Sequence, residues 1–393
     1  MNQIETRWAG VWAIVGAGVV ASLQVGKVII AAPLLRQDMG LDLASIGTLT
    51  AVFSVLGVVG GIAAGGVIAR FGARRMLLLG LSATALGTAM GAIAPSYALL
   101  LASRVVEGLG FLMITVAGPA ALQRLVSASG RDFAFALWSC YMPTGMAIAM
   151  LASQAFDHWQ AVWWCAGVAV IVSLASVAAL LPSGHAARAP LSWRGMRQDT
   201  VDTLSAAGPV LLALSFTLYS LMFFALFTFL PVLLMDQLGL TLAQAGLYSA
   251  IASAANIVGN LGAGVLLARG WRRSTLIACA SVTMGVVALL IFRSVLPAMP
   301  TFLLCVLFSA VGGLIPATLL GTAPLVAPRP ALTAASVGLV MQGSNLGQVI
   351  GPVTVGGVID RYGWGAASTI VLAAGLGGVL IAAALRRVRA ARL

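Results

Sequence analysis

The stretch GGVIARFGARRMLL at residues 65–78 has a counterpart in the second half of the chain, GAGVLLARGWRRSTLI at 262–277. Each copy follows a long apolar run and carries a pair of adjacent arginines. When those pairs are superposed, two glycines of each copy coincide, and the matched positions are Arg74 with Arg272, Arg75 with Arg273, Gly66 with Gly264 and Gly72 with Gly270. A repeat at this distance indicates a duplicated structural unit, so we expect two similar halves.

Apolar residues dominate the whole chain and not only these two stretches. Of 393 residues, 61% are hydrophobic and only 8% are charged, and the mean hydropathy is +1.05. A soluble domain is roughly 45–50% apolar and about 25% charged. The composition therefore indicates an integral membrane protein. The formal charge of +12 is not gathered into dense basic tracts, and we expect no nucleic-acid partner.

The apolar runs are long enough to cross a lipid bilayer, which takes about 20 residues per helix. They predict twelve spans, at 9–34, 44–69, 76–94, 97–122, 133–156, 161–181, 208–235, 242–268, 274–292, 298–323, 332–359 and 364–385. A polar stretch at 182–207 separates the first six from the last six. We predict an all-α membrane protein with a six-helix bundle at 1–181, a cytoplasmic linker at 182–207 and a second six-helix bundle at 208–393.

The arginines fall mostly on one side of this topology. The predicted cytoplasmic segments hold Arg7, Arg70, Arg74, Arg75, Arg124, Arg131, Arg188, Arg194, Arg197, Arg269, Arg272, Arg273, Arg329, Arg386, Arg387, Arg389 and Arg392. The outer loops hold only Arg36, Arg293 and Arg361. Cytoplasmic loops of membrane proteins carry an excess of Lys and Arg, so we expect both termini in the cytoplasm and an inner-membrane location.

Three motifs resemble the major facilitator superfamily of transporters. They are GGVIARFGARR after the second span, RVVEGLG at 104–110 in the fourth and GQVIGPVTVGG at 347–357 in the eleventh. A looser resemblance, through MQGSNLGQVIGP at 341–352, is to the cyanate-permease-type branch. The family implies two pseudo-twofold bundles that alternate access to a central site. One departure is Ala69, which replaces the aspartate of the family's loop motif and puts its cytoplasmic charge pairing in doubt.

Three ionisable residues lie well inside the predicted spans: Lys27, Arg104 and Glu107. Such residues are costly in a membrane and are functional candidates by default. Lys27, the one lysine in the chain, and Arg104 should both lie roughly 12 Å below the outer ends of their helices. We expect Glu107 to be the main proton-linked carboxylate and the two cations to bind an anionic substrate. The alternative is a structural ion pair, with the spare cation reaching outward.

Uncharged polar residues within the spans extend the predicted substrate site. The candidates are Gln24, Tyr141, Tyr219, Asn256, Gln342 and Asn345. Helix-to-helix hydrogen bonding and aromatic packing are the alternatives for these positions. Gln24 stands where related exporters often carry an aspartate, and this departure weakens the interpretation as a standard proton-driven drug antiporter.

Glycines spaced four residues apart predict close helix contacts that could act in gating. One row is Gly57, Gly61 and Gly65 in the second span, and the other is Gly343, Gly347 and Gly351 in the eleventh. By family resemblance these spans face each other across the halves, so we expect Gly61 and Gly347 at that contact and assign Arg74 and Arg75 to the same gate. Static packing within one half is the alternative.

The remaining features narrow the class of protein. Cys140, Cys165, Cys279 and Cys305 lie inside predicted spans without metal-ligand spacing, so we predict no disulfide, metal or cofactor. A membrane enzyme would need a catalytic cluster, and a channel would need a ringed filter; the sequence indicates neither. We therefore predict a monomeric secondary transporter, in contact with the lipid bilayer, that moves a small organic, anionic solute with proton coupling, by symport or antiport. The alternative is a proton-driven drug or metabolite exporter.

Overall fold

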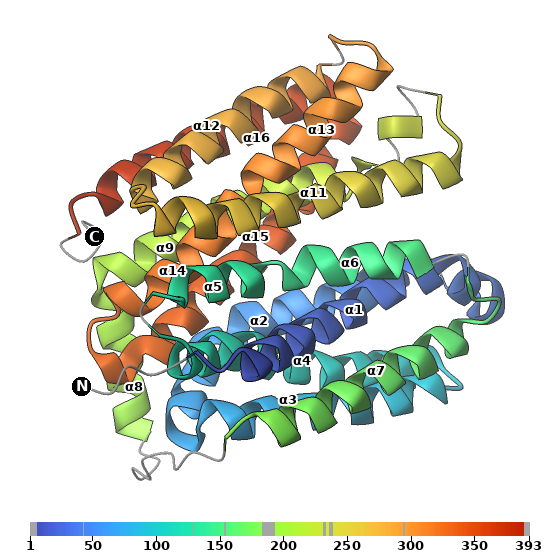
Figure 1. Cartoon of the computed structure of the whole chain (residues 1–393). Coiled ribbons are helices and arrows are strands. Elements are labelled where there is room, and N and C mark those ends of the chain that lie inside the picture. The colour runs from blue at the N-terminus through green and yellow to red at the C-terminus, as the bar shows by residue number, and fades with distance from the viewer. Residues whose placement is uncertain are drawn as a thin grey trace.

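The computed structural model describes residues 6–41, 43–127, 129–152, 155–182, 193–230, 233–235, 239–293 and 295–388. Its helices are arranged as two bundles, as predicted, each with six spans, of which one consists of two consecutive helices (Figure 1). The first bundle contains α1 (Trp8–Met39), α2 (Leu43–Phe71), α3 (Ala73–Ala92), α4 (Tyr97–Leu125), α5 (Arg131–Ser139), α6 (Tyr141–Ala152) and α7 (Trp159–Leu180). The second contains α9 (Ala207–Phe227), α11 (Leu242–Ala268), α12 (Arg273–Phe292), α13 (Ala298–Gly312), α14 (Leu314–Val326), α15 (Thr333–Tyr362) and α16 (Trp364–Leu385).

Within the described ranges, eleven helical segments are long and apolar enough to cross a membrane. The remaining predicted span corresponds to α15, which is 30 residues long but rich in Gly, Gln, Asn and Ser. These residues lower its hydropathy, yet α15 packs between α2 and α9, where its polar groups meet other helices instead of lipid. The chain is therefore a multi-pass membrane protein.

Two predicted spans are divided in the structure. The fifth breaks at Cys140 into α5 and α6, and the tenth breaks at Gly313 into α13 and α14. In each case a proline, Pro143 or Pro316, follows three residues after the break. Proline has no N–H, and its ring clashes with the carbonyl group four residues earlier. The prolines therefore account for both interruptions, which apolar composition alone does not reveal.

The matched glycines of the repeat have the same conformational role in both halves. Gly72 has a φ of 86° and Gly270 a φ of 84°, in the left-handed region that other residues rarely adopt. Both stand in the tight connection between consecutive antiparallel spans, α2 to α3 and α11 to α12. The repeat in the sequence is thus a repeat of backbone geometry.

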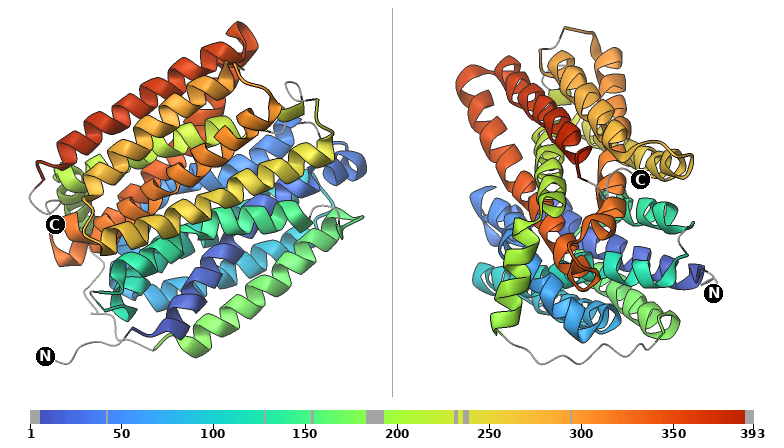
Figure 2. Two further views of the ribbon diagram at one scale, coloured as in Figure 1. Left: turned by 45° about the horizontal axis from the view of Figure 1, so that its top comes forward. Right: turned by 90° about the vertical axis from the view of Figure 1, so that its left-hand side faces the viewer.

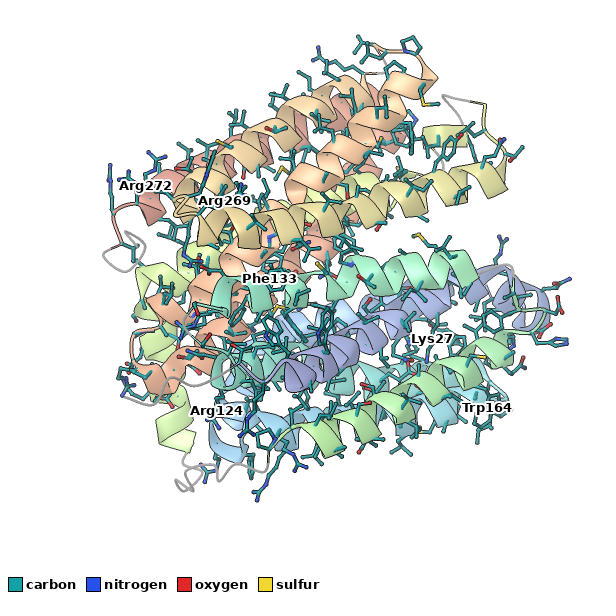
Figure 3. The ribbon with its side chains drawn as sticks, viewed as in Figure 1. Lys27, Arg124, Phe133, Trp164, Arg269 and Arg272 are labelled. Carbon is teal, nitrogen blue, oxygen red and sulfur yellow. The ribbon has the colours of Figure 1, made fainter. Side chains whose placement is uncertain are left out.

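The start of α1 and the end of α16 lie at the same end of the molecule (Figure 1), as an even number of crossings requires. Arg124, Arg269 and Arg272 lie at this end too, whereas Trp164 lies at the other (Figure 3). We call it the arginine-rich end. Three arginines of the topology prediction, Arg188, Arg389 and Arg392, lie outside the described residues.

Most helices pack chiefly within their own half, whereas α2 and α5 pack chiefly on helices of the other half. Figure 2 shows the two halves from two further directions. Contacts between the halves join α15 with α2 and α4, α11 with α5 and α6, and α14 with α5. A helix of the linker, α8 (Trp193–Ser205), contacts α2, α9 and α15. The domain boundaries at 181 and 208 stay predictions.

Candidate functional site

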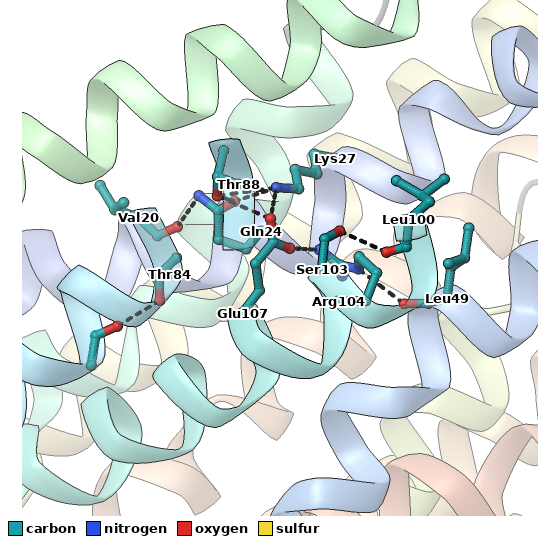
Figure 4. Close-up of polar contacts among 11 residues, drawn as sticks. Val20, Gln24, Lys27, Leu49, Thr84, Thr88, Leu100, Ser103, Arg104 and Glu107 are labelled. Carbon is teal, nitrogen blue, oxygen red and sulfur yellow. Dashed lines mark hydrogen bonds and ion pairs between the residues drawn. The ribbon is translucent and has the colours of Figure 1, made fainter. Parts of the chain in front are cut away.

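Three predicted site residues meet inside the first bundle. Lys27 of α1 donates from Nζ to Oε1 of Glu107 on α4 at 2.5 Å, and Arg104 donates from a terminal guanidinium nitrogen to the other carboxylate oxygen (Figure 4). Arg104 and Glu107 are three residues apart, which places them on one face of α4. One carboxylate therefore serves two cations.

Two uncharged side chains complete this arrangement. Lys27 Nζ also donates to Oε1 of Gln24 (2.7 Å) and approaches Oγ1 of Thr88 on α3 (3.4 Å). The Thr88 hydroxyl lies 3.0 Å from Glu107 Oε1 and 3.2 Å from Gln24 Oε1. We call these five residues, Gln24, Lys27, Thr88, Arg104 and Glu107, the ionic cluster. Gln24 lies one helical turn from Lys27, so the first span itself supplies an acceptor for the Lys27 ammonium group.

Aromatic rings and glycines enclose the ionic cluster. Lys27 Nζ lies 4.7 Å from the ring centroid of Trp163 on α7, and the guanidinium carbon of Arg104 lies 4.1 Å from that of Phe53 on α2. A Cβ at Gly87 of α3 would meet Cγ of Glu107 at 2.7 Å, so only glycine allows this approach.

Burial of the ionic cluster is nearly complete. Lys27 is 2% exposed, and Arg104 and Glu107 are 0% exposed, so neither cation reaches the surface as the structural alternative proposed. Arg104 donates from Nε to the carbonyl oxygen of Leu49 (3.1 Å), but its second terminal nitrogen has no hydrogen-bond partner. Two buried cations share one carboxylate, and the cluster carries a surplus positive charge when all three groups are ionised.

A second polar group lies inside the other bundle. Asn256 of α11 donates to the Tyr219 hydroxyl of α9 (3.1 Å) and to the carbonyl oxygen of Ser309 on α13 (3.0 Å). Asn260 donates to Asn256 Oδ1 (2.8 Å). Tyr219 and Asn256 are buried. Tyr219 and Asn256 thus meet as predicted substrate candidates, but they link three helices of their own half.

A third group of candidates lies where the halves touch. Gln342 of α15 donates to the carbonyl oxygen of Val58 on α2 (2.6 Å), and Ser54 Oγ lies 3.3 Å from Gln348 Oε1. A Cβ at Gly57 would collide with the Asn345 side chain. Gln342 and Asn345 therefore lie at the contact between α2 and α15, which we call the seam.

The glycine row of α2 lies in this seam, but the row Gly343, Gly347 and Gly351 of α15 does not. A Cβ at Gly61 would meet the Gly338 carbonyl oxygen at 2.6 Å, and one at Gly65 would overlap Ala334. In contrast, Cβ atoms at Gly343, Gly347 and Gly351 would meet Ala213, Thr217 and Leu221 of α9. The prediction that Gly347 lies between the halves is wrong, because its row faces another side of α15.

The residue that sequence reasoning missed at the seam is Gly338. A Cβ there would collide with the Gly61 carbonyl group. Its signal is the four-residue spacing of Ala334, Gly338 and Gln342, which places all three on one helix face.

The paired arginines of the repeat have different partners. Arg74 donates to the carbonyl oxygens of Leu181 (2.9 Å) and Ala178 (2.8 Å) and so caps the end of α7, while Arg75 is exposed. Arg273, the match of Arg75, pairs with Asp132 of α5 across the halves at 2.7 Å. Sequence reasoning missed this contact, because the sequence does not show which helices of the two halves lie side by side.

The remaining candidate, Tyr141, packs against Trp138 with ring centroids 4.8 Å apart and ring planes tilted by 35°. The site candidates thus form separate groups: the ionic cluster, the Tyr219–Asn256 pair, the seam and Tyr141. Within the described residues, no group of three His, Cys, Asp or Glu side chains is placed to hold a metal ion. The cysteines are unpaired; Cys140 and Cys305 are buried, and Cys165 and Cys279 are exposed.

Comparisons with known proteins agree with this architecture. Residues 14–341 match the model of the Major Facilitator Superfamily. The chain is 30% identical over 219 residues to a chloramphenicol resistance protein of Streptomyces lividans, covering 53% of this chain and 54% of that protein. It is 28% identical over 207 residues to the puromycin resistance protein pur8 of Streptomyces alboniger, covering 51% and 40%.

The chain spans about half the length, or less, of these curated relatives. Among solved structures, the human organic anion transporter MFSD10 (TETRAN) superposes with a TM-score of 0.81, over 96% of this chain and 99% of that chain. With 17% identity, this likeness concerns the fold alone. The family match extends over most of the sequence and both halves, and the chain therefore belongs to the Major Facilitator Superfamily.

Proposed function

We propose that this transporter moves a small organic anion across the bacterial inner membrane by alternating access, with proton coupling. The observation that carries the proposal is the ionic cluster, in which two buried cations share Glu107. Buried charge in a membrane helix is expensive and usually marks an ion or substrate pathway. A surplus positive charge there favours an anion far more strongly than it would in water.

The seam supplies the moving contact of the proposed cycle. Gly57, Gly61 and Gly65 let α2 lie directly on α15, and small residues allow two helices to separate and meet again without side chains interlocking. The pair of Asp132 with Arg273 joins the halves beside α11. We propose that both contacts hold the arginine-rich end closed. Arg74 and Arg75 would help to shape that end.

The substrate would contact groups from both halves. We assign this role to Lys27 and Arg104 in the first half, together with Gln24, Tyr141, Tyr219, Asn256, Gln342 and Asn345. These groups are apart in the present arrangement, so a common site requires the halves to move. Proton coupling is assigned to the ionic cluster around Glu107.

A second candidate function is proton-driven export of drugs or metabolites. The observation that favours it is the similarity, at 30% and 28% identity, to proteins named for chloramphenicol and puromycin resistance. A positively charged cluster attracts an anion and repels a cation. In an exporter of cations, the charged cluster would therefore expel the solute instead of binding it.

The topology belongs to the same proposal. The arginine-rich end would face the cytoplasm, together with both termini and the linker, and the protein would act as a monomer. Reporter fusions at Pro95 and Leu393 test this orientation, since the Pro95 reporter should lie outside and the Leu393 reporter in the cytoplasm, and the reverse arrangement would contradict it. The same side for both would contradict it.

One experiment separates the two functions. Purified protein is screened for thermal stabilisation by organic acids and by cationic drugs, and hits are tested in proteoliposomes under an imposed pH gradient. An organic acid that stabilises the protein and accumulates with protons supports the first function. A cationic drug that moves against protons supports the second. Movement of a stabilising solute that is independent of the pH gradient contradicts proton coupling.

A further inference from the structure

The ionic cluster contains three side chains with ionisable groups, but only two of them can exchange a proton. Arginine is not deprotonated in proteins, so Arg104 keeps its charge. The exchangeable proton of the cluster therefore belongs either to Glu107 or to Lys27. The hydrogen bonds of these two groups decide between them.

Both carboxylate oxygens of Glu107 are already occupied as acceptors. Oε1 faces Lys27 Nζ (2.5 Å) and the Thr88 hydroxyl (3.0 Å), and Oε2 accepts from Arg104. A proton on Oε2 would point at a guanidinium group, which can only donate. A proton on Oε1 would compete with the ammonium group of Lys27. Either proton would leave two buried cations without a counter-charge, which is strongly unfavourable.

The amine of Lys27 can exist in two forms with little rearrangement. As an ammonium group it has three donors, and it has three oxygen neighbours, on Glu107, Gln24 and Thr88. After losing one proton it can still donate to Glu107 and Gln24. Its free lone pair can then accept from Thr88, since a hydroxyl group turns to donate or accept. Loss of this proton cancels the surplus charge of the cluster.

No other described charged group is placed to take over this role. The helices that pack most closely on α1 are α4, α6 and α7. On α4 the cluster contains Arg104 and Glu107, whereas Arg124 lies at the arginine-rich end. On α6 the titratable group is Tyr141, which packs against Trp138, and on α7 it is the exposed Cys165.

Farther along α1 itself, Arg36 and Asp38 are exposed near its end. On α2 and α3, the charged residues Arg70, Arg74 and Arg75 lie beside the connection between these helices, while Lys27 meets α3 at Thr88. Arg131 and Asp132 begin α5, and Asp132 pairs with Arg273 of the other half. The cluster is therefore separate from the other charged side chains on the described helices of the first bundle.

We infer that Lys27 carries the exchangeable proton of this transporter and that Glu107 is its fixed counter-charge. Gln24 and Thr88 hold the amine in both forms. This inference rests on the proposed proton-coupled function, and it moves the proton from Glu107, where the sequence predicts it, to the amine on α1. The loaded cluster would attract an anion and the unloaded cluster would release it.

The sequence permits a direct test, because Lys27 is the single lysine among 393 residues. Full-length protein labelled with 15N at the lysine Nζ gives one lysine side-chain signal in nuclear magnetic resonance. The protein is held in lipid nanodiscs without substrate, and the pH is varied over the range used for transport. We expect the signal to pass from the ammonium to the amine form. A signal that stays in the ammonium form throughout would overturn the inference.

A matched pair of variants on α3 links the transition to the cluster. Thr88 and Thr84 are both 1% exposed and lie one turn apart, but only Thr88 contacts Lys27, while Thr84 bonds the Gly80 carbonyl group. Thr88→Val should move the midpoint pH of the Lys27 transition, and Thr84→Val should leave it in place. Equal midpoints in both variants would count against the assignment of Thr88.

Proteoliposome measurements keep this inference separate from the proposed function. Lys27→Met removes the exchangeable proton, so we expect complete loss of accumulation driven by a pH gradient. Gradient-driven accumulation that persists in Lys27→Met would overturn the inference. Lys27 could pass from the ammonium to the amine form in a protein that moves substrate without protons. That result would support the change of protonation at Lys27 and overturn the proposed proton coupling.

Discussion

The two halves of the molecule join their inner helices by different chemistry. In the first half, α1, α3 and α4 are linked through charged groups around Glu107. In the second half, α9, α11 and α13 are linked through the uncharged side chain of Asn256. An amide has no proton to exchange in the physiological range, whereas an amine and a carboxylate can change charge. The two copies of the duplicated unit thus differ in their inner contacts, and we propose that only the charged cluster of the first copy responds to protons.

The largest effect is expected from Glu107→Gln, which removes the one counter-charge of Lys27 and Arg104. Breaking a buried ion pair by deleting one partner costs about 3–5 kcal/mol. The variant should therefore unfold at a much lower temperature than the wild type, measured by thermal unfolding in detergent. If Glu107→Gln is as stable as the wild type, the stability of the first half does not depend on this buried charge. The contrast with the second half would then be wrong.

A second substitution sharpens this result. Lys27→Met added to Glu107→Gln removes one of the two uncompensated cations, and part of the lost stability should return. Because the two side chains are in direct contact, their effects should not be additive. Additive losses would show that the pair does not act as a unit.

The next largest effects are expected from substitutions in the two glycine rows. Gly61→Leu fills the seam, where Gln342 and Gly338 of the other half leave no room for a Cβ. It should block transport while leaving each bundle folded. Gly347→Leu instead overpacks α15 against α9 inside one half, and overpacking costs about 1–3 kcal/mol. Uptake and thermal unfolding, measured on both variants, should therefore separate the two rows.

The control for this pair is Gly16→Leu on α1, because a Cβ at Gly16 would meet nothing within 4 Å. It should have little effect on either measurement. Equal loss of transport and equal stability in the Gly61 and Gly347 variants would contradict the distinction between seam and bundle.

Hydropathy and the repeat were sufficient to predict the helical spans, because lipid demands long apolar helices whatever the details of packing. The apolar runs also identified candidate site residues, because Lys27, Arg104 and Glu107 are charged residues within them. The structure brings these three side chains together. One contact, between Lys27 and Gln24, could also have been predicted, since residues three apart share a helix face.

The partners of the other features could not be predicted, because they depend on how the helices are turned. A four-residue spacing places Gly343, Gly347 and Gly351 on one face but does not say which helix that face meets. The structure turns the face toward α9, and a different row containing Gly338 toward α2. The pair of Asp132 with Arg273 likewise joins positions 141 residues apart.

A smaller effect is expected from Asp132→Asn, which breaks the ion pair between the halves. Asp132 is 24% exposed and Arg273 is 12% exposed, so solvent weakens the attraction and the loss should be about 1 kcal/mol. If the pair holds the arginine-rich end closed, that end should react faster with a cysteine reagent in the variant. The matched control is Arg329→Gln, because Arg329 is 54% exposed and pairs with Asp199 and Asp202 of the linker helix; it should change the reaction rate less.

The smallest effect is expected from Tyr219→Phe in the second half. The change removes the hydroxyl group that accepts from Asn256 at 3.1 Å, but Asn256 keeps its bond to the Ser309 carbonyl oxygen at 3.0 Å. Hydrogen bonds between membrane helices contribute on average about 0.6 kcal/mol, so thermal unfolding should change only slightly.

The more informative property of Tyr219→Phe is its pH dependence. Since neither partner changes charge in the physiological range, the small loss of stability should be the same at every pH at which the protein is folded. Lys27→Met, in contrast, should differ from the wild type by an amount that varies with pH, because it removes the group that we propose gains and loses a proton. Thermal unfolding of both variants across one pH series tests this contrast. A loss in Tyr219→Phe that varies with pH as strongly as that in Lys27→Met would mean that the second half also responds to protons.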